Sequence, residues 1–542
     1  MKSDIDQFNS RRSTVYSKNG VVATSQPLAA EAGISILRKG GNAFDAAVAT
    51  AATLNVVEPP STGIGGDAFA LFRTSDGDVG ALNSCGGAPA EATLDKIRHK
   101  IKHDDGSEKI SMPQSGPHTV TVPGAARGWE STVEKFGNLP FREVLQPAIN
   151  HAENGYPVSE VISALWKKGE DRLVGPHARN QYLTDGNAPS VGEIITLPAL
   201  GNTLQKIAKN GADEFYEGGL AEKISKEVQS GGGLLSVSDL AQFEPDFIDP
   251  IKTSYRDVEI FQLPPSTQGA IVLETLNIME ELNQCDLDNS VERNHYLIEA
   301  MKIGFRDGHK YISDPNYVKI PELYSKPYAH KKSRKVEKYA ASETSTGYPL
   351  SDASDTVLLT AADQEGNVIS FINSLYGAFG SGLVPDETGI VLHSRGGSFS
   401  LNPSHANCIS PRKKPFHTLI PGLIRFDRND WAAYGVMGGF MQPQGHVQVV
   451  SNLVDRELPL QQTLDEPRWR FLENGKLAIE SRFDSQTASK LVRRGHEIEL
   501  YPPNQYNEGP HGGFGGGQIV RNNQGTLSAA TDPRKDGASL GY

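Results

Sequence analysis

Residues 356–374 read TVLLTAADQEGNVISFINS, and this stretch decides the fold that the sequence predicts. Two largely apolar runs, 356–362 and 368–374, flank a short polar segment that contains Gly366. Runs of this length on either side of a glycine-containing turn are typical of a β-hairpin. We therefore expect two antiparallel strands joined by a turn at 363–367.

The turn predicts how the two strands align. A three-residue loop with a glycine in the left-handed position fits a type I turn followed by a bulge, and it pairs Asp363 with Asn367. Counting along both strands from that pair places Thr356 opposite Ser374. A slip of one residue would place Asn373 there instead, because successive side chains of a strand point to opposite faces.

Thr356 has a second property, which depends on its becoming a chain end. If the peptide bond between Asp355 and Thr356 breaks, the new terminus carries a hydroxyl nucleophile and its own α-amino base. An α-amine has a reference pKa of about 7.7–8.0, so much of it is neutral at physiological pH. The hydroxyl can then attack an amide carbonyl to form an ester, which water or an acceptor amine resolves. Ser374, on the opposite strand, is expected to orient the hydroxyl.

The residues before Thr356 are polar. Residues 331–338 form a charge run, and residues 340–355 are rich in Ser, Thr, Ala, Gly and Pro. Such a composition buries little apolar surface. We expect an exposed linker at about 333–355 that is accessible to cleavage, and the alternative is an ordinary loop between a helix and a strand.

Motifs spread over most of the chain resemble those of the γ-glutamyltranspeptidase family. The resemblance is carried by the order and spacing of these motifs rather than by any one of them. They are VVATSQP at 21–27, GGNAFDAA at 40–47, EPP at 58–60, GIGGD at 63–67, VPG at 122–124, LPPS at 263–266, Asp355-Thr356, GSG at 380–382, Gly438-Gly439 and SAATDPR at 528–534.

The resemblance implies a fold and a processing event. Members of that family are self-cleaving N-terminal-nucleophile hydrolases, so the expected fold is of the α/β class, a four-layer αββα sandwich. Cleavage before Thr356 would give subunits 1–355 and 356–542, which together form one structural domain. The two fragments are expected to stay together as a heterodimer, or as a dimer of heterodimers. The paired glycines of the family correspond to Gly438 and Gly439, whose N–H groups would stabilise an oxyanion. A tight turn after a strand is the alternative interpretation of that pair.

The substrate pocket departs from the pattern of the best-known family members. Their Arg-Glu pair, which clamps a γ-glutamyl group, falls here on Cys85 and Gly86. Other pocket positions have also changed, and they fall on Ser398, Tyr376, His417 and Thr418. Truncating one partner of a buried charge pair costs about 2–5 kcal/mol, so we expect poor turnover of γ-glutamyl substrates.

Arg395, within HSRGGS at 393–398, is the candidate replacement for the missing clamp. A guanidinium binds a carboxylate in bidentate geometry. The alternative is an arginine that lies on the surface or stabilises the fold. With Tyr376 and His417 nearby, the pocket is similar to those of family relatives that hydrolyse other acyl amides, such as oxamate amidohydrolases and cephalosporin-acylase-like proteins. The expected substrate is a small amide with an anionic acyl group.

Composition and missing motifs exclude other classes. The net charge of −12 argues against nucleic acid or an anionic membrane as a partner. The sequence contains no H-E-x-x-H, G-x-S-x-G or Walker A motif, so neither a metal nor a cofactor is expected. The three cysteines are Cys85, Cys285 and Cys408, whose odd number and wide spacing favour a reducing compartment. The first residues lack an apolar h-region, and no apolar run is long enough to cross a bilayer, which together point to the cytoplasm.

Local signals predict further elements. Ser25 is expected to cap a helix that begins near Pro27 and ends at Gly40-Gly41, and Asn42 to cap a second helix that reaches about Leu54. Strands are expected at 68–72, 79–82, 423–426 and 431–434, and an amphipathic helix at 446–455.

Two classes of function follow. The first is a self-processed amide hydrolase or acyltransferase, acting either on γ-glutamyl groups or on another small carboxylated amide. The second is a relative that keeps the fold for binding and has no catalytic activity. The combination of Thr356, Ser374 and the Gly438-Gly439 pair favours the enzyme.

Overall fold

The computed structural model describes residues 12–101, 111–282, 289–340, 355–501 and 513–542. Most of the predicted linker, from 341 to 354, therefore lies outside the described residues. Within the described residues, no helix combines the length and the apolar character that a membrane crossing requires.

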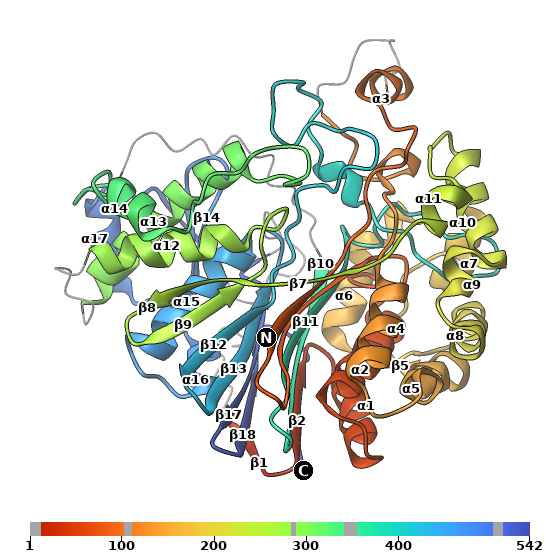
Figure 1. Cartoon of the computed structure of the whole chain (residues 1–542), viewed down its shortest axis with the longest axis horizontal. Helices are drawn as coiled ribbons and strands as arrows, with labels where there is room; N and C mark the ends of the chain where they lie inside the picture. The colour runs from red at the N-terminus through yellow and green to blue at the C-terminus, as the bar shows by residue number, and fades with distance from the viewer. Residues whose placement is uncertain (1–11, 102–110, 283–288, 341–354, 502–512) are drawn as a thin grey trace, which may run out of the picture.

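Two seven-stranded antiparallel sheets form the centre of the molecule (Figure 1). The first sheet has the order β1 (Val15–Ser17), β18 (Thr526–Thr531), β17 (Gly516–Asn523), β13 (Asp430–Met437), β12 (Gly422–Asp427), β9 (Val258–Gln262) and β8 (Ile251–Tyr255). The second has the order β19 (Ala538–Gly541), β2 (Gly20–Thr24), β10 (Asp355–Asp363), β11 (Val368–Tyr376), β3 (Asp67–Arg73), β4 (Val79–Ser84) and β7 (Asp246–Ile248).

Helices cover the outer face of each sheet. The second sheet shares a hydrophobic core with α1 (Pro27–Arg38), α2 (Ala43–Val57), α4 (Ala125–Phe136), α5 (Phe141–Asn154), α6 (Glu160–Gly169), α7 (Pro176–Tyr182), α8 (Pro198–Asn210), α9 (Asp213–Tyr216), α10 (Gly219–Ser230) and α11 (Val237–Ala241). The first sheet packs on α12 (Gly269–Glu281), α13 (Ser290–Tyr311), α14 (Lys326–Ser333), α15 (Met441–Val454) and α16 (Leu460–Asp465).

A third core lies between the sheets, and it includes Phe69, Leu358, Ile372, Leu423 and Val520. Apolar side chains thus fill the space between two helical layers and two sheets, as expected for a layered domain. The predicted four-layer αββα sandwich is confirmed.

Smaller elements complete the chain. They are α3 (Leu94–Lys100), α17 (Ser485–Arg493), the strand pair β5 (Tyr156–Pro157) and β6 (Ile194–Ile195), the small sheet of β14 (Trp469–Phe471), β15 (Leu477–Glu480) and β16 (Ile498–Tyr501), and the 3-10 helices η1 (Pro117–Thr119), η2 (Glu170–Arg172) and η3 (Arg395–Ser398).

Both sheets mix strands from the two sides of the Asp355–Thr356 bond. In the second sheet, β10 lies between β2, which precedes that bond, and β11, which follows it. In the first sheet, β9, which precedes that bond, pairs with β12, which follows it. A break before Thr356 would therefore leave two chains that share both sheets and the core between them.

The hairpin forms in the predicted register. Asp363 donates its N–H to the carbonyl of Asn367 at 3.2 Å, and Gly366 has a φ of +99°. The pairing runs from Ala362 with Val368 to Val357 with Asn373. Beyond that point a bulge places Asp355 opposite Tyr376.

Two local predictions need correction. Ser25 does not cap α1, because its hydroxyl donates to Glu58 at 2.6 Å while the side chain of Gln26 accepts from the N–H of Leu28. The helix predicted at 446–455 begins earlier, at Met441, and is buried on nearly every side. Its polar Gln444 and Gln448 do not face solvent, because they bond to backbone atoms of the neighbouring strand β14.

The other predicted elements are present. Asn42 caps α2 by accepting from the N–H groups of Phe44 and Asp45, and the helix extends to Val57. The strands predicted in the first and last thirds of the chain correspond to β3, β4, β12 and β13.

Candidate active site

Thr356 and Ser374 face each other at one end of the sandwich. Their hydroxyl oxygens are 3.0 Å apart, and both side chains are buried. Ser374 Oγ also accepts the N–H of Tyr376 at 2.9 Å. Tyr376 has a φ of +77°, which is unusual for a residue other than glycine. The N–H of Tyr376 uses only a lone pair of the Ser374 oxygen, so the hydroxyl proton of Ser374 remains available to donate to Thr356.

Ser374→Ala should slow both chain cleavage and substrate turnover by roughly tenfold to 100-fold. It removes one hydrogen bond to the hydroxyl of Thr356, the expected nucleophile, and such a bond is worth about 1.5–3 kcal/mol where charge develops. The matched control is Ser370→Ala, on the same face of β11, where a buried hydroxyl donates to the carbonyl of Tyr434 at 2.9 Å. That variant should lose stability and keep both rates. Equal effects of the two substitutions on the rates, measured by gel densitometry and product release, would contradict a role for Ser374 in positioning the nucleophile.

Stacking of the sheets brings the end of β13 to the start of β10. A Cβ built on Gly435 would lie 2.8 Å from the side chain of Leu358, so these two positions are in contact across the sheets. Ser370, which pairs with Thr360, bonds to Tyr434. Strands β10 and β13 therefore run in opposite directions where the sheets stack. Because Gly435 contacts Leu358, the residues that follow Gly435 extend toward the start of β10, where Thr356 lies.

Gly438 and Gly439 follow directly after β13. Their φ values are +119° and +59°, so both occupy backbone conformations that favour glycine. Gly438 accepts the N–H of Met441 at 2.9 Å, and Gly439 accepts the side-chain N–H of Gln268 at 3.0 Å. The first bond fixes the peptide plane that carries the N–H of Gly439, and the second fixes the next plane along the chain.

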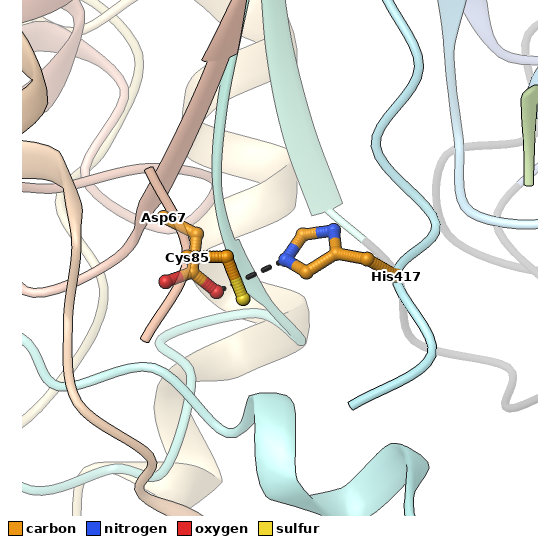
Figure 2. A group of neighbouring side chains, drawn as sticks. All are labelled: Asp67, Cys85 and His417. Carbon is orange, nitrogen blue, oxygen red and sulfur yellow. Dashed lines mark hydrogen bonds and ion pairs between the residues drawn. The ribbon is translucent and has the colours of Figure 1, made fainter. Parts of the chain in front are cut away.

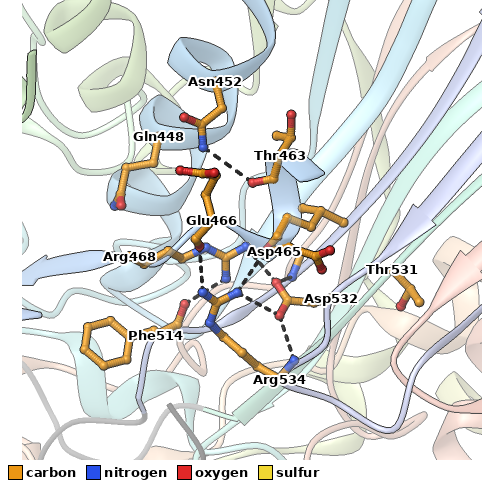
Figure 3. A network of polar contacts seen from close by, with 12 residues as sticks. Gln448, Asn452, Thr463, Asp465, Glu466, Arg468, Phe514, Thr531, Asp532 and Arg534 are labelled. Atoms are coloured by element: carbon orange, nitrogen blue, oxygen red, sulfur yellow. Dashed lines mark hydrogen bonds and ion pairs between the residues drawn. The ribbon is translucent and has the colours of Figure 1, made fainter. Parts of the chain in front are cut away.

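A buried ion network of Arg468, Asp532 and Arg534 (Figure 3) is connected to the glycine pair through residues 514 and 515. Arg468 donates to the carboxylate of Asp532 at 2.6 Å and to the carbonyl of Phe514 at 3.0 Å. The next residue, Gly515, leaves only 3.1 Å between its Cα and a Cβ built on Gly438. The SAATDPR motif at 528–534 thus contributes, through Asp532, to the shape of the site.

Asp67, the first residue of β3, is the neighbour of Ser374 across the sheet. Its Oδ2 lies 3.0 Å from His417 Nε2, 3.2 Å from His393 Nδ1 and 3.8 Å from Arg395 Nε, and all four side chains are fully buried. Burial alone would raise the pKa of the Asp67 carboxyl, but the two histidines outweigh it and hold that pKa well below its usual range. Asp67 is therefore the anion of this cluster.

His417 is the neutral donor of the cluster. The N–H of Leu419 donates to its Nδ1 at 3.2 Å, so its Nε2 carries the proton and donates to Asp67. Burial and the charge of Arg395 lower the pKa of His417 to about 3, although Asp67 acts in the opposite direction. The imidazole is uncharged at neutral pH.

Cys85 lies beside this cluster, with one potential ligand atom each of Asp67, Cys85 and His417 within 4.8 Å of one another (Figure 2). Burial and the nearby Asp67 carboxylate raise the pKa of the Cys85 thiol, so the thiol is protonated. The next residue, Gly86, has no room for a side chain, because a Cβ there would lie 2.3 Å from the carbonyl of Val122. An Arg-Glu clamp is therefore absent at this position and could not be restored by substitution at Gly86 alone.

Arg395, in η3, is fully buried, so the surface interpretation of this residue is wrong. Its guanidinium carbon lies 4.3 Å from the ring centre of Tyr376, and its Nη1 donates to the hydroxyl of Thr418 at 3.0 Å. Among the described residues, its Nε and Nη2 have no hydrogen-bond partner. Asp67 balances the charge, and one edge of the guanidinium keeps unused donors.

Tyr376 and Ser398 line a cavity of about 340 Å³, which we call the site cavity. The hydroxyl of Ser398 lies within donating distance of two carbonyls, those of Arg395 at 2.9 Å and Phe416 at 3.0 Å. The structure thus brings all five sequence-predicted pocket residues together, with Tyr376 and Ser398 at the cavity wall and Arg395, His417 and Thr418 in a second layer behind them.

Sequence reasoning missed two members of this cluster, Asp67 and His393. Asp67 ends the GIGGD motif and begins a strand whose next five residues are apolar, and such an isolated charge was a usable signal. His393 lies two residues before Arg395, and nothing local marks it.

A threonine at the start of a central strand, with a hydroxyl partner opposite it and a glycine pair beside it, defines the N-terminal-nucleophile hydrolase class when it occurs in an αββα sandwich. The model of the gamma-glutamyltranspeptidase family matches residues 29–542, and the chain belongs to that family.

Several relatives are similar over their whole length. A glutathione hydrolase-like proenzyme of Bacillus subtilis, YwrD, is 34% identical over 97% of this chain and 99% of its own. An oxamate amidohydrolase proenzyme of Klebsiella pneumoniae is 33% identical over 98% of this chain and 100% of its own. The crystal structure of a cephalosporin acylase from Bacillus halodurans superimposes with a TM-score of 0.90 at 38% identity, covering 99% of this chain and 98% of that one.

Proposed function

We propose that this chain is an amide hydrolase that cuts itself between Asp355 and Thr356 and then uses the freed Thr356 as its nucleophile. The observation that carries the proposal is the buried pair of hydroxyls, Thr356 and Ser374, 3.0 Å apart in the register that the turn predicts. Family membership and relatives named hydrolase, amidohydrolase and acylase support an amide as the substrate class.

Self-cleavage needs only Thr356, the preceding peptide bond and water as reactants. The Thr356 hydroxyl attacks the carbonyl carbon of Asp355, the C–N bond between the two residues breaks, and the threonine nitrogen takes the hydroxyl proton. Residue 355 is then held as an ester on Thr356 Oγ. Water hydrolyses that ester, which frees the carboxylate of Asp355 and the hydroxyl and amine of Thr356.

Substrate hydrolysis repeats the same chemistry on another amide. The α-amine of Thr356 takes the hydroxyl proton while Oγ attacks the substrate carbonyl, and the N–H groups of Gly438 and Gly439 stabilise the oxyanion. The amine product leaves with the proton, and water then hydrolyses the acyl ester. An acceptor amine in place of water would give transfer instead.

The fragments 1–355 and 356–542 remain together in this account as a heterodimer, or as a dimer of heterodimers. Each sheet contains strands of both fragments, so neither fragment has a complete core alone. We place the enzyme in the cytoplasm, and cell fractionation tests that placement.

The substrate that we propose is a small amide with an anionic acyl group. The Nη2 of Arg395 supports it, because this donor lacks a hydrogen-bond partner among the described residues and the guanidinium lies directly behind Tyr376 of the cavity wall. A buried unpaired donor costs about 1–3 kcal/mol, which a substrate carboxylate that reaches it would offset. A γ-glutamyl group is the less favoured substrate because Cys85 and Gly86 provide no clamp for it.

The experiment that tests the activity is a panel assay with the purified, processed protein. Release of ammonia or amine is measured from γ-glutamyl amides, oxamate-type amides and neutral acyl amides. We expect the carboxylated amides to be hydrolysed best. A fully processed protein that hydrolyses no amide in the panel would contradict the proposal, and it would favour the non-catalytic relative.

Arg395→Ala should raise KM for an anionic amide by about tenfold or more while kcat changes less. A carboxylate contact formed equally in the ground state and the transition state affects mainly KM. The internal control is a neutral amide with the same leaving group, assayed on the same preparation, which should be little affected. Equal losses on both substrates would leave Arg395 with the single role of balancing the charge of Asp67.

A further inference from the structure

Two lining residues of the site cavity adjoin the proposed catalytic groups, and other lining residues are exposed. Tyr376 donates to Ser374 and Phe440 follows Gly439, and both residues line the cavity. The lining residues Gln114 and Asn402 are exposed. A volume of about 340 Å³ is within the usual range of small-molecule pockets, about 300–1,000 Å³.

The buried end of the cavity is aromatic. Phe416 and Phe440 stack with ring centres 6.0 Å apart and an angle of 20° between their planes. Phe399 and Tyr376 complete this part of the wall. Aromatic walls favour a flat apolar group, which they contact through offset or edge-on stacking.

The described lining of the cavity contains no Asp, Glu, Lys or Arg side chain. The lining residues within the described part of the chain are Ser111, Met112, Gln114, His309, Tyr376, Gly397, Ser398, Phe399, Ser400, Leu401, Asn402, His405, Asn407, Phe416 and Phe440. The two histidines lie with their ring centres 4.8 Å apart. Burial and the neighbouring His405 lower the pKa of His309 to about 4, and burial also lowers the pKa of His405.

From these observations we infer that the site cavity binds an uncharged aromatic substituent of the amide substrate. The inference rests on the proposed function and adds a second determinant to it. Arg395 would bind the carboxylate, whereas the cavity selects for a ring elsewhere on the molecule. Among the described lining residues a charged group would have no ion-pair partner, and burying a charge without one is strongly unfavourable.

The test compares substrates that share a carboxylate and differ only by a phenyl group. One arm places the ring on the amine, with oxamate against N-phenyloxamate. The other arm places it on the acyl part, with malonamate against 2-phenylmalonamate. In at least one arm, kcat/KM should be about tenfold or more higher with the ring, because even one buried methylene discriminates by 10-fold or more. A second carboxylate on the ring should remove this advantage.

A matched pair of variants locates the effect. His405→Trp adds a larger ring inside the cavity, and it should raise KM for the favoured phenyl substrate by about tenfold while leaving its small counterpart unchanged. The control is His177→Trp, which adds the same ring on α7, outside the described lining of the cavity, and should behave like the wild type with both substrates.

The outcomes separate the inference from the proposed function. Equal kcat/KM with and without the ring in both arms, or a loss in His405→Trp that is the same for both substrates of a pair, would overturn the inference while amide hydrolysis stands. If no amide is hydrolysed, the proposed function fails. In that case, calorimetry of N-phenyloxamate binding tests the cavity without catalysis. His405→Trp should weaken the binding of N-phenyloxamate, and unchanged binding would overturn the inference.

Discussion

Thr356→Ala should remain one uncut chain and should lose amide hydrolysis by a factor on the order of 10⁴ or more. The variant lacks the hydroxyl that attacks the carbonyl of Asp355, so neither the new amine nor the nucleophile is formed. Removing a catalytic nucleophile costs about this much in hydrolases that work through an acyl-enzyme. A denaturing gel reports the cleavage, and product release from the preferred amide reports the activity.

Thr356→Ser is the matched control for this loss. It keeps the hydroxyl and the future α-amine and removes only the methyl group, so it should still cleave and turn over, more slowly than wild type. Cleavage of Thr356→Ala at the wild-type rate would contradict the assignment of the nucleophile. A Thr356→Ser variant that neither cleaves itself nor hydrolyses the amide would indicate that the methyl group is needed to hold the hydroxyl toward Ser374.

Gly438→Ala is the second large effect, with an expected fall in kcat of about 10²–10³. A φ of +119° is strained for alanine, and the added Cβ would lie 3.1 Å from the Cα of Gly515. The backbone must shift, which moves the N–H groups away from the oxyanion. Removing one oxyanion donor in other enzymes costs about 2.7–4 kcal/mol. Steady-state kinetics on the processed variant measure the fall.

Gly525→Ala is its control. Gly525 also has a positive φ, +89°, but lies in the turn between β17 and β18, where a Cβ would meet nothing within 4 Å. It should lose about 1 kcal/mol of stability and keep its kcat. If Gly438→Ala retains wild-type kcat while Gly525→Ala behaves as expected, the glycine pair is only a turn after β13.

Local rules predicted the centre of the fold well. The turn at Gly366 determines the register, and the register determines that Ser374 rather than Asn373 faces Thr356. The αββα layering is different, because it followed from the family resemblance. The periodicity of individual segments does not tell which sheet a strand joins.

The buried cluster around Asp67 shows why other parts of the site could not be predicted from the sequence. Asp67, His393, Arg395 and His417 meet although more than 320 residues separate the first from the others. No local pattern reports such a contact. The same limit applies to α15, for which the sequence predicts an amphipathic helix at 446–455, whereas the polar side chain of Gln448 bonds to the buried strand β14. Ser25 failed as a cap for a related reason, since Glu58 takes its hydroxyl.

The central claim is that this chain makes its own nucleophile by breaking the bond before Thr356. Amino-terminal sequencing of the purified wild-type protein, together with the intact masses of its fragments, tests it most directly. We predict a fragment that begins Thr-Val-Leu-Leu and a companion that ends at Asp355. An active preparation that consists only of the uncut chain would contradict the claim.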